Sequence, residues 1–262
     1  MSKEPAGTET ALRLETLENG AVWRVVLNTP KANLIDRAKS EALTRVFNDA
    51  HGDARVKAVI IEGAGPNFSF GASVQEHLPE ECAAMLTSFH GLFRAMLDAS
   101  VVTLAAVRGH CLGGGLELAA FCHRVFAAEH SQLGQPEIAL GVFAPVASVV
   151  LPERMGRGAA EDLLLSGRSL SAREALQRGL VDEIDEDPFT AALGYARTHL
   201  LPHSASSLRW VVRAARRDYG ERLITELSRL EAMYVYDLMR TADASVGLHA
   251  FLEKRPPRWE NR

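Results

Sequence analysis

Three consecutive glycines, Gly113–Gly115, stand directly before an apolar, helix-forming run that carries one acid, Glu117. Glycine lets the backbone approach a ligand closely because it has no Cβ, and a helix N-terminus offers unpaired N–H groups and the positive end of a dipole. The pattern therefore predicts a binding site for an oxygen atom that carries negative charge. A tight strand-to-helix turn without any ligand would use the same residues and stays open as the alternative.

Two glutamates could supply proton transfer beside this turn. A glutamate in a first helical turn gains roughly 0.3–1 kcal/mol from the helix dipole and needs no further role. The neighbours of Glu117 between Leu116 and Phe121 are all apolar, so we expect a buried helix, and a buried carboxylate needs a partner or a function. Glu137 follows Pro136 and precedes an apolar run, which predicts a rigid loop-to-strand edge. Together the acids indicate paired acid–base chemistry, although either alone could be a hydrogen-bonded structural acid.

A third segment, residues 65–77, follows a predicted buried strand and contains the small residues Gly71, Ala72 and Ser73. Such residues allow a backbone N–H to point into a pocket. With the N–H of Gly114 it would complete an oxyanion hole, a pair of donors that stabilises a developing negative oxygen. A plain surface loop is the alternative.

The elements that must position these residues alternate between strands and helices. Alternating hydrophobicity on both sides of Asn19-Gly20 predicts a β-hairpin, and Asp36 is placed to cap a helix. Residues 56–65 and 101–109 read as buried strands. The helix between those strands carries an apolar stripe of Met85, Phe89, Leu92, Phe93 and Met96.

The last third of the chain changes character. Ser171 and Glu174 form a predicted capping box, and Gly179 ends that helix before a strand-like stretch at 180–184. Beyond Pro202 the strands cease, and residues 204–220 and 221–240 predict two amphipathic helices. We expect a core in residues 1–200 and a C-terminal helical region in residues 201–262 that packs on the core and on a neighbouring subunit.

Composition excludes several classes of protein. The 262 residues are 47% hydrophobic and 24% charged, which is typical of a globular chain, and the net charge of −4 argues against a nucleic-acid partner. No stretch reaches the roughly 20 apolar residues of a membrane span. Three cysteines without a CxxC pair and an N-terminus without an apolar h-region favour the cytoplasm. Dinucleotide, phosphate-loop and GxSxG signatures are absent, and no common zinc spacing fits His110, Cys111, Cys122 and His123.

Five segments resemble the enoyl-CoA hydratase/isomerase (crotonase) family and cover the chain in order from about Leu12. They are FSFGASVQEH, AAVRGHCLGGGLELA, GQPEIALGVFAP, LLLSGRSLSAREALQRGLVDEI and AFLEKRPPRW. The resemblance implies an α/β fold, a spiral of strand-strand-helix units with a C-terminal helical region, assembled as trimers or dimers of trimers. It implies an acyl-CoA thioester as substrate, no cofactor besides the CoA of that substrate, and no metal.

The resemblance also implies roles for residues of this chain. The thioester oxygen would be held by the N–H groups of Ala72 and Gly114, and Glu117 and Glu137 match both hydratase glutamates, which favours water addition. The family's CoA and substrate contacts map to Lys31, Ala32, Asn33, Phe70, Ser73 and Val74.

Departures from the common hydratase pattern resemble a branch of the family that hydrates a cyclic dienoyl thioester. They are VFAPVASVV after GQPE, His123 in place of an aspartate, and Ala72-Ser73 in place of Ala-Asp. A hydratase or isomerase of linear acyl-CoA esters and a non-catalytic CoA-ester-binding scaffold are the alternatives. A ring-shaped pocket would draw its walls from Phe68, Phe70, Phe89, Phe143 and Pro145, each of which could equally be ordinary core.

Overall fold

The computed structural model of the protein describes residues 11–29 and 31–262. The N-terminal segment on which the expectation of a missing secretion signal rests lies outside the described residues. Within them, no helix combines the length and the hydrophobicity that crossing a bilayer requires.

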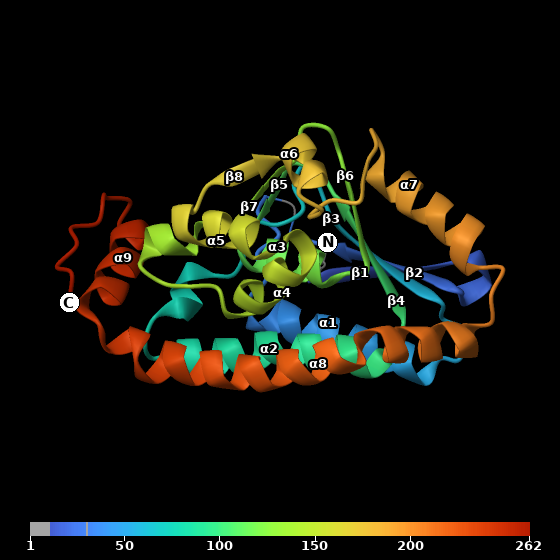
Figure 1. Ribbon diagram of the computed structural model, residues 1–262, viewed down its shortest axis with the longest axis horizontal. Helices are drawn as coiled ribbons and strands as arrows, with labels where there is room; N and C mark the ends of the chain where they lie inside the picture. Colours follow the sequence, from blue (N-terminus) through green and yellow to red (C-terminus); the bar gives the residue numbers. More distant parts are fainter. Residues whose placement is uncertain (1–10, 30) are drawn as a thin grey trace, which may run out of the picture.

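A six-stranded sheet forms the centre of the molecule (Figure 1). A hairpin opens it, in which β1 pairs antiparallel with β2 around the short helix η1 (Glu18–Gly20), so the prediction at Asn19-Gly20 is confirmed. The remaining neighbours run parallel. The strand order is β1 (Leu12–Leu17), β2 (Val22–Leu27), β3 (Ala58–Gly63), β4 (Val102–Val107), β6 (Arg124–Ala127) and β9 (Glu183–Ile184).

A second, three-stranded sheet contains β5 (His110–Leu112), β7 (Gln132–Gly134) and β8 (Ser169–Ser171). Along the chain, β4 leads into β5 and then into helix α3 (Gly114–Phe121), and β6 leads into β7 and then into the short helix η3 (Pro136–Leu140). Both β4 and β6 are thus followed by a strand of the small sheet and a helix. This repetition is the expected spiral, and its strand-to-helix turns are the places where the glycines and both glutamates lie.

Helices cover both faces of the large sheet. In Figure 1, α1 (Arg37–Gly52), α2 (Cys82–Ala99) and the long α8 (Ala205–Tyr236) run along the lower edge. On the other face α7 (Pro188–Tyr195) packs on β3, β4 and β6. The remaining helices are η2 (Val74–His77), α4 (Pro145–Met155), α5 (Arg157–Ser166), α6 (Ala172–Gln177), η4 (Ala196–Leu200), η5 (Leu238–Arg240) and α9 (Ala242–Leu252).

The central strands are buried on both faces, which explains why they read as continuous apolar runs. Along β3, Val59 and Ile61 join the core beneath α1 and α2, while Ile60 joins the core beneath α7. The same two-residue alternation continues in β4, where Ala105 and Leu104 face opposite cores. The sheet is therefore fixed from both sides, and the turns at its edge are held in place.

Local signals for helix ends are confirmed where they rest on neighbouring residues. The Asp36 carboxylate accepts a hydrogen bond from the Lys39 N–H at 2.8 Å, and Ser171 and Glu174 form the reciprocal capping box. Gly179 has φ +78° just beyond the end of α6. The predicted strand at 180–184 is formed only at Glu183–Ile184.

The prediction of two helices in residues 204–240 is wrong, because a single helix, α8, runs through Gly220. A Cβ at Gly220 would lie 3.3 Å from Leu97 Cδ2. The glycine therefore permits close packing of α8 on α2 rather than ending a helix.

Candidate active site

The N-terminus of α3 lies beside the loop that contains Ala72. The nitrogen of Ala72 is 3.3 Å from the position that a Cβ on Gly114 would occupy, so the two expected donors stand next to each other. Neither N–H makes a hydrogen bond to another residue in the described part of the chain. Two free, adjacent N–H groups have the arrangement of an oxyanion hole.

Each of the three glycines has its own steric reason. Gly113 adopts φ 52° and ψ −129°, and a Cβ there would lie only 2.6 Å from Glu137 Oε1. A Cβ on Gly114 would crowd the Ala72 nitrogen and the Phe89 ring, and one on Gly115 would lie 2.6 Å from Ser69 Cβ. The turn is therefore glycine-rich because a carboxylate, a donor pair and a packed loop all approach this backbone.

Glu117 lies in the first turn of α3, and every residue of this helix is buried, as predicted. Its Oε1 accepts a hydrogen bond from the Ala147 N–H at 2.7 Å, near the N-terminus of α4. Burial raises the pKa of the Glu117 carboxyl well above its usual range, while the N–H groups of Ala147 and Val146 oppose part of that rise. The helix turn after VFAP thus supplies the partner that a buried carboxylate needs.

Glu137 lies in η3, a single helical turn, so the expected loop-to-strand edge is wrong. The proline fixes the first position of this turn, and the chain then continues into α4 without a strand. Among the described residues, the buried Oε2 of Glu137 has no hydrogen-bond partner. Burial first, and then the charge of Glu117, raise the pKa of the Glu137 carboxyl.

The two carboxyl groups form an unequal pair. Glu117 is stabilised in its ionised form by backbone donors, whereas Glu137 lacks them on Oε2 and carries the added repulsion of Glu117. Like charges close together favour one shared proton, which the less well solvated group retains. The arrangement can take a proton with one carboxylate and give one with the other.

A cavity of about 660 Å³ opens beside Glu137. Four of the residues predicted for substrate binding or the oxyanion hole line it: Phe70, Ala72, Ser73 and Val74. The C-terminal helix α9 closes another side. Further residues of the cavity wall come from α9, from the tail that follows it and from the loops around the glycine turn. They are Gly247, Phe251, Leu252, Arg255, Pro257, Leu112, Leu140 and His77.

The other predicted CoA-contact segment lies directly beside the first. The carbonyl of Ala32 accepts a hydrogen bond from the Phe70 N–H at 2.9 Å. The buried Asn33, with φ 47°, donates from Nδ2 to the carbonyls of Ala64 and Asn67. Lys31 is exposed next to it, outside the cavity wall.

The structure distributes the five candidates for the pocket wall over different places. Phe68 lies wholly in the main core, and Phe89 reaches the glycine turn with its ring edge. Pro145 begins α4, and Phe143 packs against Tyr234 with 5.3 Å between ring centroids. Of these five residues, Phe70 alone is in the cavity wall.

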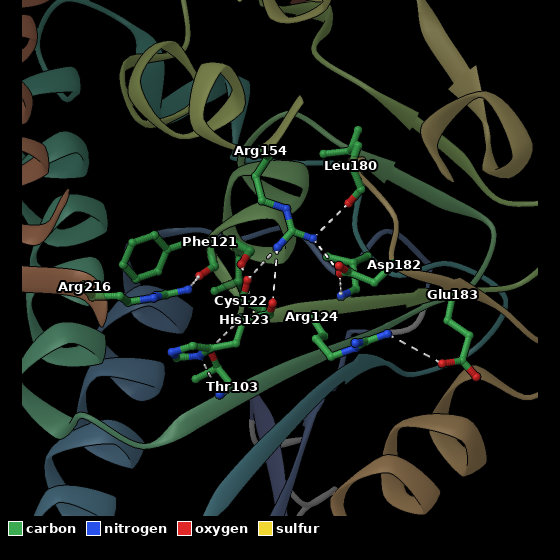
Figure 2. A network of polar contacts seen from close by, with 12 residues as sticks. Thr103, Phe121, Cys122, His123, Arg124, Arg154, Leu180, Asp182, Glu183 and Arg216 are labelled. Atoms are coloured by element: carbon green, nitrogen blue, oxygen red, sulfur yellow. Dashed lines mark hydrogen bonds and ion pairs between the residues drawn. The ribbon is translucent and has the colours of Figure 1, made fainter. Parts of the chain in front are cut away.

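The far end of α3 is held by two arginines (Figure 2). Arg154 donates to the carbonyls of Cys122, His123 and Leu180 and pairs with Asp182 at 2.7 Å. Arg216 donates to the Phe121 carbonyl at 2.8 Å. Cations at a helix C-terminus satisfy its free carbonyls and its negative dipole end, so both ends of α3 are fixed.

His123, the departure from the family's aspartate, belongs to this network. Its Nδ1 accepts a hydrogen bond from the Thr103 N–H at 2.9 Å, and burial lowers its pKa to about 3, which keeps the imidazole neutral. In residues 11–29 and 31–262, no set of three or more His, Cys, Asp or Glu side chains is arranged to hold a metal ion.

Sequence reasoning missed the residues that reach the cavity from far along the chain. His77 and Phe251 belong to motifs that were recognised for other residues, and Tyr234, which contacts His77, comes from a helix that showed only an amphipathic pattern. The one signal that the sequence offered for these residues was His77 itself, a histidine in a segment expected to line the substrate pocket.

Comparison with known proteins agrees with this geometry. The sequence profile of the family described as enoyl-CoA hydratase/isomerase matches residues 17–262. A cyclohexa-1,5-dienecarbonyl-CoA hydratase from Thauera aromatica is 50% identical over 244 residues, which cover 93% of this chain and 95% of that protein. A probable enoyl-CoA hydratase from Bacillus subtilis is 31% identical over 248 residues, covering 90% and 94%.

Solved structures give the same picture. The chain is similar to an enoyl-CoA hydratase from Mycobacterium avium subsp. paratuberculosis, with a TM-score of 0.84, 26% identity, and coverage of 97% of this chain and 100% of that one. An enoyl-CoA hydratase/isomerase from Xanthobacter autotrophicus superposes with a TM-score of 0.83 at 27% identity, covering 94% of each chain.

Proposed function

The chain belongs to the enoyl-CoA hydratase/isomerase family, and from that premise we infer that it is a hydro-lyase that adds water to cyclohexa-1,5-diene-1-carbonyl-CoA. The product is 6-hydroxycyclohex-1-ene-1-carbonyl-CoA, a step of benzoyl-CoA breakdown. The observation that carries this proposal is the 50% sequence identity, over 93% of the chain, to a hydratase of that diene. The paired glutamates beside two free N–H groups supply the chemistry it needs.

The first half of the reaction forms the carbon–oxygen bond. Water lies between the carboxyl groups, and the ionised Glu117 takes one of its protons while the oxygen attacks the ring carbon β to the thioester. The electron pair of that double bond moves onto the thioester oxygen. The N–H groups of Ala72 and Gly114 hold this oxygen, and losing one such donor typically costs about 3 kcal/mol of transition-state stabilisation.

The second half places the proton. The enolate is conjugated with the remaining double bond, so its electron pair can return through the ring to the carbon opposite the one attacked. Glu137, which keeps the proton of the pair, donates it there. One water has then been added, and the proton taken by Glu117 passes to Glu137 to restore the starting state.

The CoA portion would extend along Lys31, Ala32 and Asn33, next to the loop that carries Ala72. In this arrangement the pantetheine enters beside Phe70 and the acyl ring enters the cavity that Glu137 borders. We further propose the trimer-based assembly of the family and a cytoplasmic location for this protein.

The experiment compares two substrates with the same preparation. Purified protein is incubated with cyclohexa-1,5-diene-1-carbonyl-CoA and with crotonyl-CoA, and chromatography with mass detection follows the gain of one water. Preference for the diene is expected. In deuterium oxide, the hydrated ring should carry deuterium on the carbon opposite the new hydroxyl. Preference for crotonyl-CoA would discard the ring substrate, and no turnover of either would favour a non-catalytic CoA-ester-binding protein.

A further inference from the structure

One polar pair at the cavity belongs to none of the steps above. His77, at the end of η2, lines the cavity together with Glu137. Its Nδ1 lies 3.0 Å from the hydroxyl of Tyr234, which comes from α8 and is completely buried. The two residues are 157 positions apart, so the fold itself creates this contact.

The protonation of the pair follows from its surroundings. Burial lowers the pKa of His77 to about 4, so the imidazole is neutral at neutral pH and carries one N–H. Burial, and then the nearby Cys82, Glu137 and Glu117, raise the pKa of Tyr234, so the phenol keeps its proton. Two neutral groups therefore share one hydrogen bond.

The direction of that hydrogen bond can be decided by counting donors. Among the described residues, the Tyr234 hydroxyl has no partner other than His77. If His77 donated from Nδ1, the buried phenol proton would have no acceptor, at a cost of roughly 1–3 kcal/mol. The Tyr234 hydroxyl therefore donates to Nδ1, and the imidazole carries its proton on Nε2.

His77 lines a mostly apolar cavity, and in this tautomer Nε2 is the ring atom that can donate a hydrogen bond to a bound molecule. The neighbouring wall consists of side chains such as Val74, Leu112, Leu140 and Phe251. The ring of the diene is a hydrocarbon and offers no acceptor to such a donor, whereas the hydrated ring carries a hydroxyl oxygen. A site with a placed donor discriminates strongly between compounds with and without its acceptor.

We propose that His77 is a specificity-determining residue that donates a hydrogen bond from Nε2 to the hydroxyl oxygen which hydration adds to the acyl group, and that Tyr234 positions it. This role rests on the proposed hydratase function. It goes beyond that function because it concerns the wall of the cavity and not the glutamate pair.

The role predicts an uneven effect on the two reaction directions. The donor contacts the reacting oxygen in the attacking water, the transition state and the hydroxylated compound, but it makes no contact with the diene itself. Its loss therefore lowers kcat but leaves KM unchanged in hydration, and raises KM but leaves kcat unchanged in dehydration. Because the equilibrium constant cannot change, kcat/KM must fall by the same factor in both directions. The loss of one neutral hydrogen bond corresponds to a factor of about 3 to 10.

Three variants separate the donor from the fold. His77→Asn keeps an acceptor for Tyr234 near the Nδ1 position and removes the donor. It should therefore show the full split, meaning a lower kcat in hydration together with a higher KM in dehydration. His77→Gln places an amide N–H near the Nε2 position and should retain most of the preference for the hydroxylated compound. Tyr234→Phe frees the imidazole and should give a smaller split, while Tyr236→Phe, at an exposed tyrosine of the same helix, is the matched control.

The measurement is kcat and KM in both directions, with the calorimetric affinity for the hydroxyl-free cyclohexanecarbonyl-CoA as a check that the cavity is intact. Unchanged affinity together with the split supports the proposal. Equal changes of KM for diene and product, or a His77→Asn variant like the wild type, would overturn it.

Failure of the proposed function is visible separately, in the wild type. If the wild type hydrates only crotonyl-CoA, the ring substrate is wrong, and the same variants are tested with crotonyl-CoA and 3-hydroxybutyryl-CoA. If it turns over neither compound, calorimetry with hydroxylated and hydroxyl-free thioesters still decides the role of His77.

Discussion

Replacing Gly113 with alanine tests how the glycine turn positions Glu137, the carboxyl group that we propose as a proton donor. A Cβ at this residue would lie 2.6 Å from Glu137 Oε1, whereas ordinary contacts begin at 3.4 Å. Since Gly113 also has φ 52°, the backbone cannot turn away cheaply, and the carboxylate must retreat by about 1 Å. A misplacement of about 1 Å typically costs about 100-fold in rate.

The expected result of Gly113→Ala is therefore a kcat for hydration about 100-fold below that of the wild type, with little change in KM, because the CoA contacts lie elsewhere. The left-handed backbone adds a loss of about 1–3 kcal/mol in the free energy of unfolding. Steady-state kinetics and urea denaturation measure the two effects independently.

Gly91→Ala is the matched control. Gly91 lies inside α2, and a Cβ there would meet no atom within 4 Å. This change should leave kcat unchanged and stabilise the fold by about 0.5–1 kcal/mol, since alanine is the better helix former. If Gly113→Ala kept kcat within about threefold of the wild type, the contact with Glu137 would not set the geometry of catalysis.

Three further predictions concern the acids and the helix that carries one of them. Glu117→Gln and Glu137→Gln should each lower kcat by about 10²- to 10⁴-fold, and steady-state rates near those of the wild type would rule out the two-acid mechanism. In urea titrations at successive pH values, the folded state binds more protons than the unfolded state between the ordinary carboxyl pKa and the raised pKa values of the pair. The free energy of unfolding should therefore fall as pH rises through this interval, by about 1.4 kcal/mol per unit of pKa shift. Glu137→Gln should make this dependence on pH weaker, and equal slopes for the variant and the wild type would contradict the raised pKa of Glu137. Arg154→Met leaves three carbonyls without their donor and should cost about 2–4 kcal/mol, whereas Arg157→Met, at an exposed position, should cost under about 0.5 kcal/mol; equal urea midpoints would refute the anchoring role.

The parts of the site that depend on neighbouring residues could be predicted from the sequence. The helix after the glycines, the burial of Glu117 and the capping box at Ser171 each follow from patterns a few residues long. The family resemblance added the fold and the match of Ala72 with Gly114, which stand side by side in the structure. Short-range patterns and the order of the motifs therefore predicted which segments form the site.

Contacts between distant segments were beyond the reach of those patterns. The partner of Glu117 is a backbone N–H 30 residues later, and a backbone donor has no sequence signature. The reason for Gly113 is the approach of Glu137, which depends on how β5 and β7 pair. Gly220 looked like a helix end because its contact with Leu97 is visible only once α8 packs on α2.

The site gathers features that cost stability, and their compensation lies around α3. Among the described residues, two N–H groups have no protein acceptor, two acids with raised pKa values interact, and Gly113 holds a left-handed backbone. Such a turn would relax if α3 could move, since shifting the helix would relieve the acids and pair its donors. Arg154 and Arg216 oppose that movement by binding the carbonyls at the other end of the helix, and Ala147 holds Glu117 from α4. The strained end can thus keep its donors free for the thioester oxygen of the proposed reaction because arginines bind the carbonyls at the opposite end.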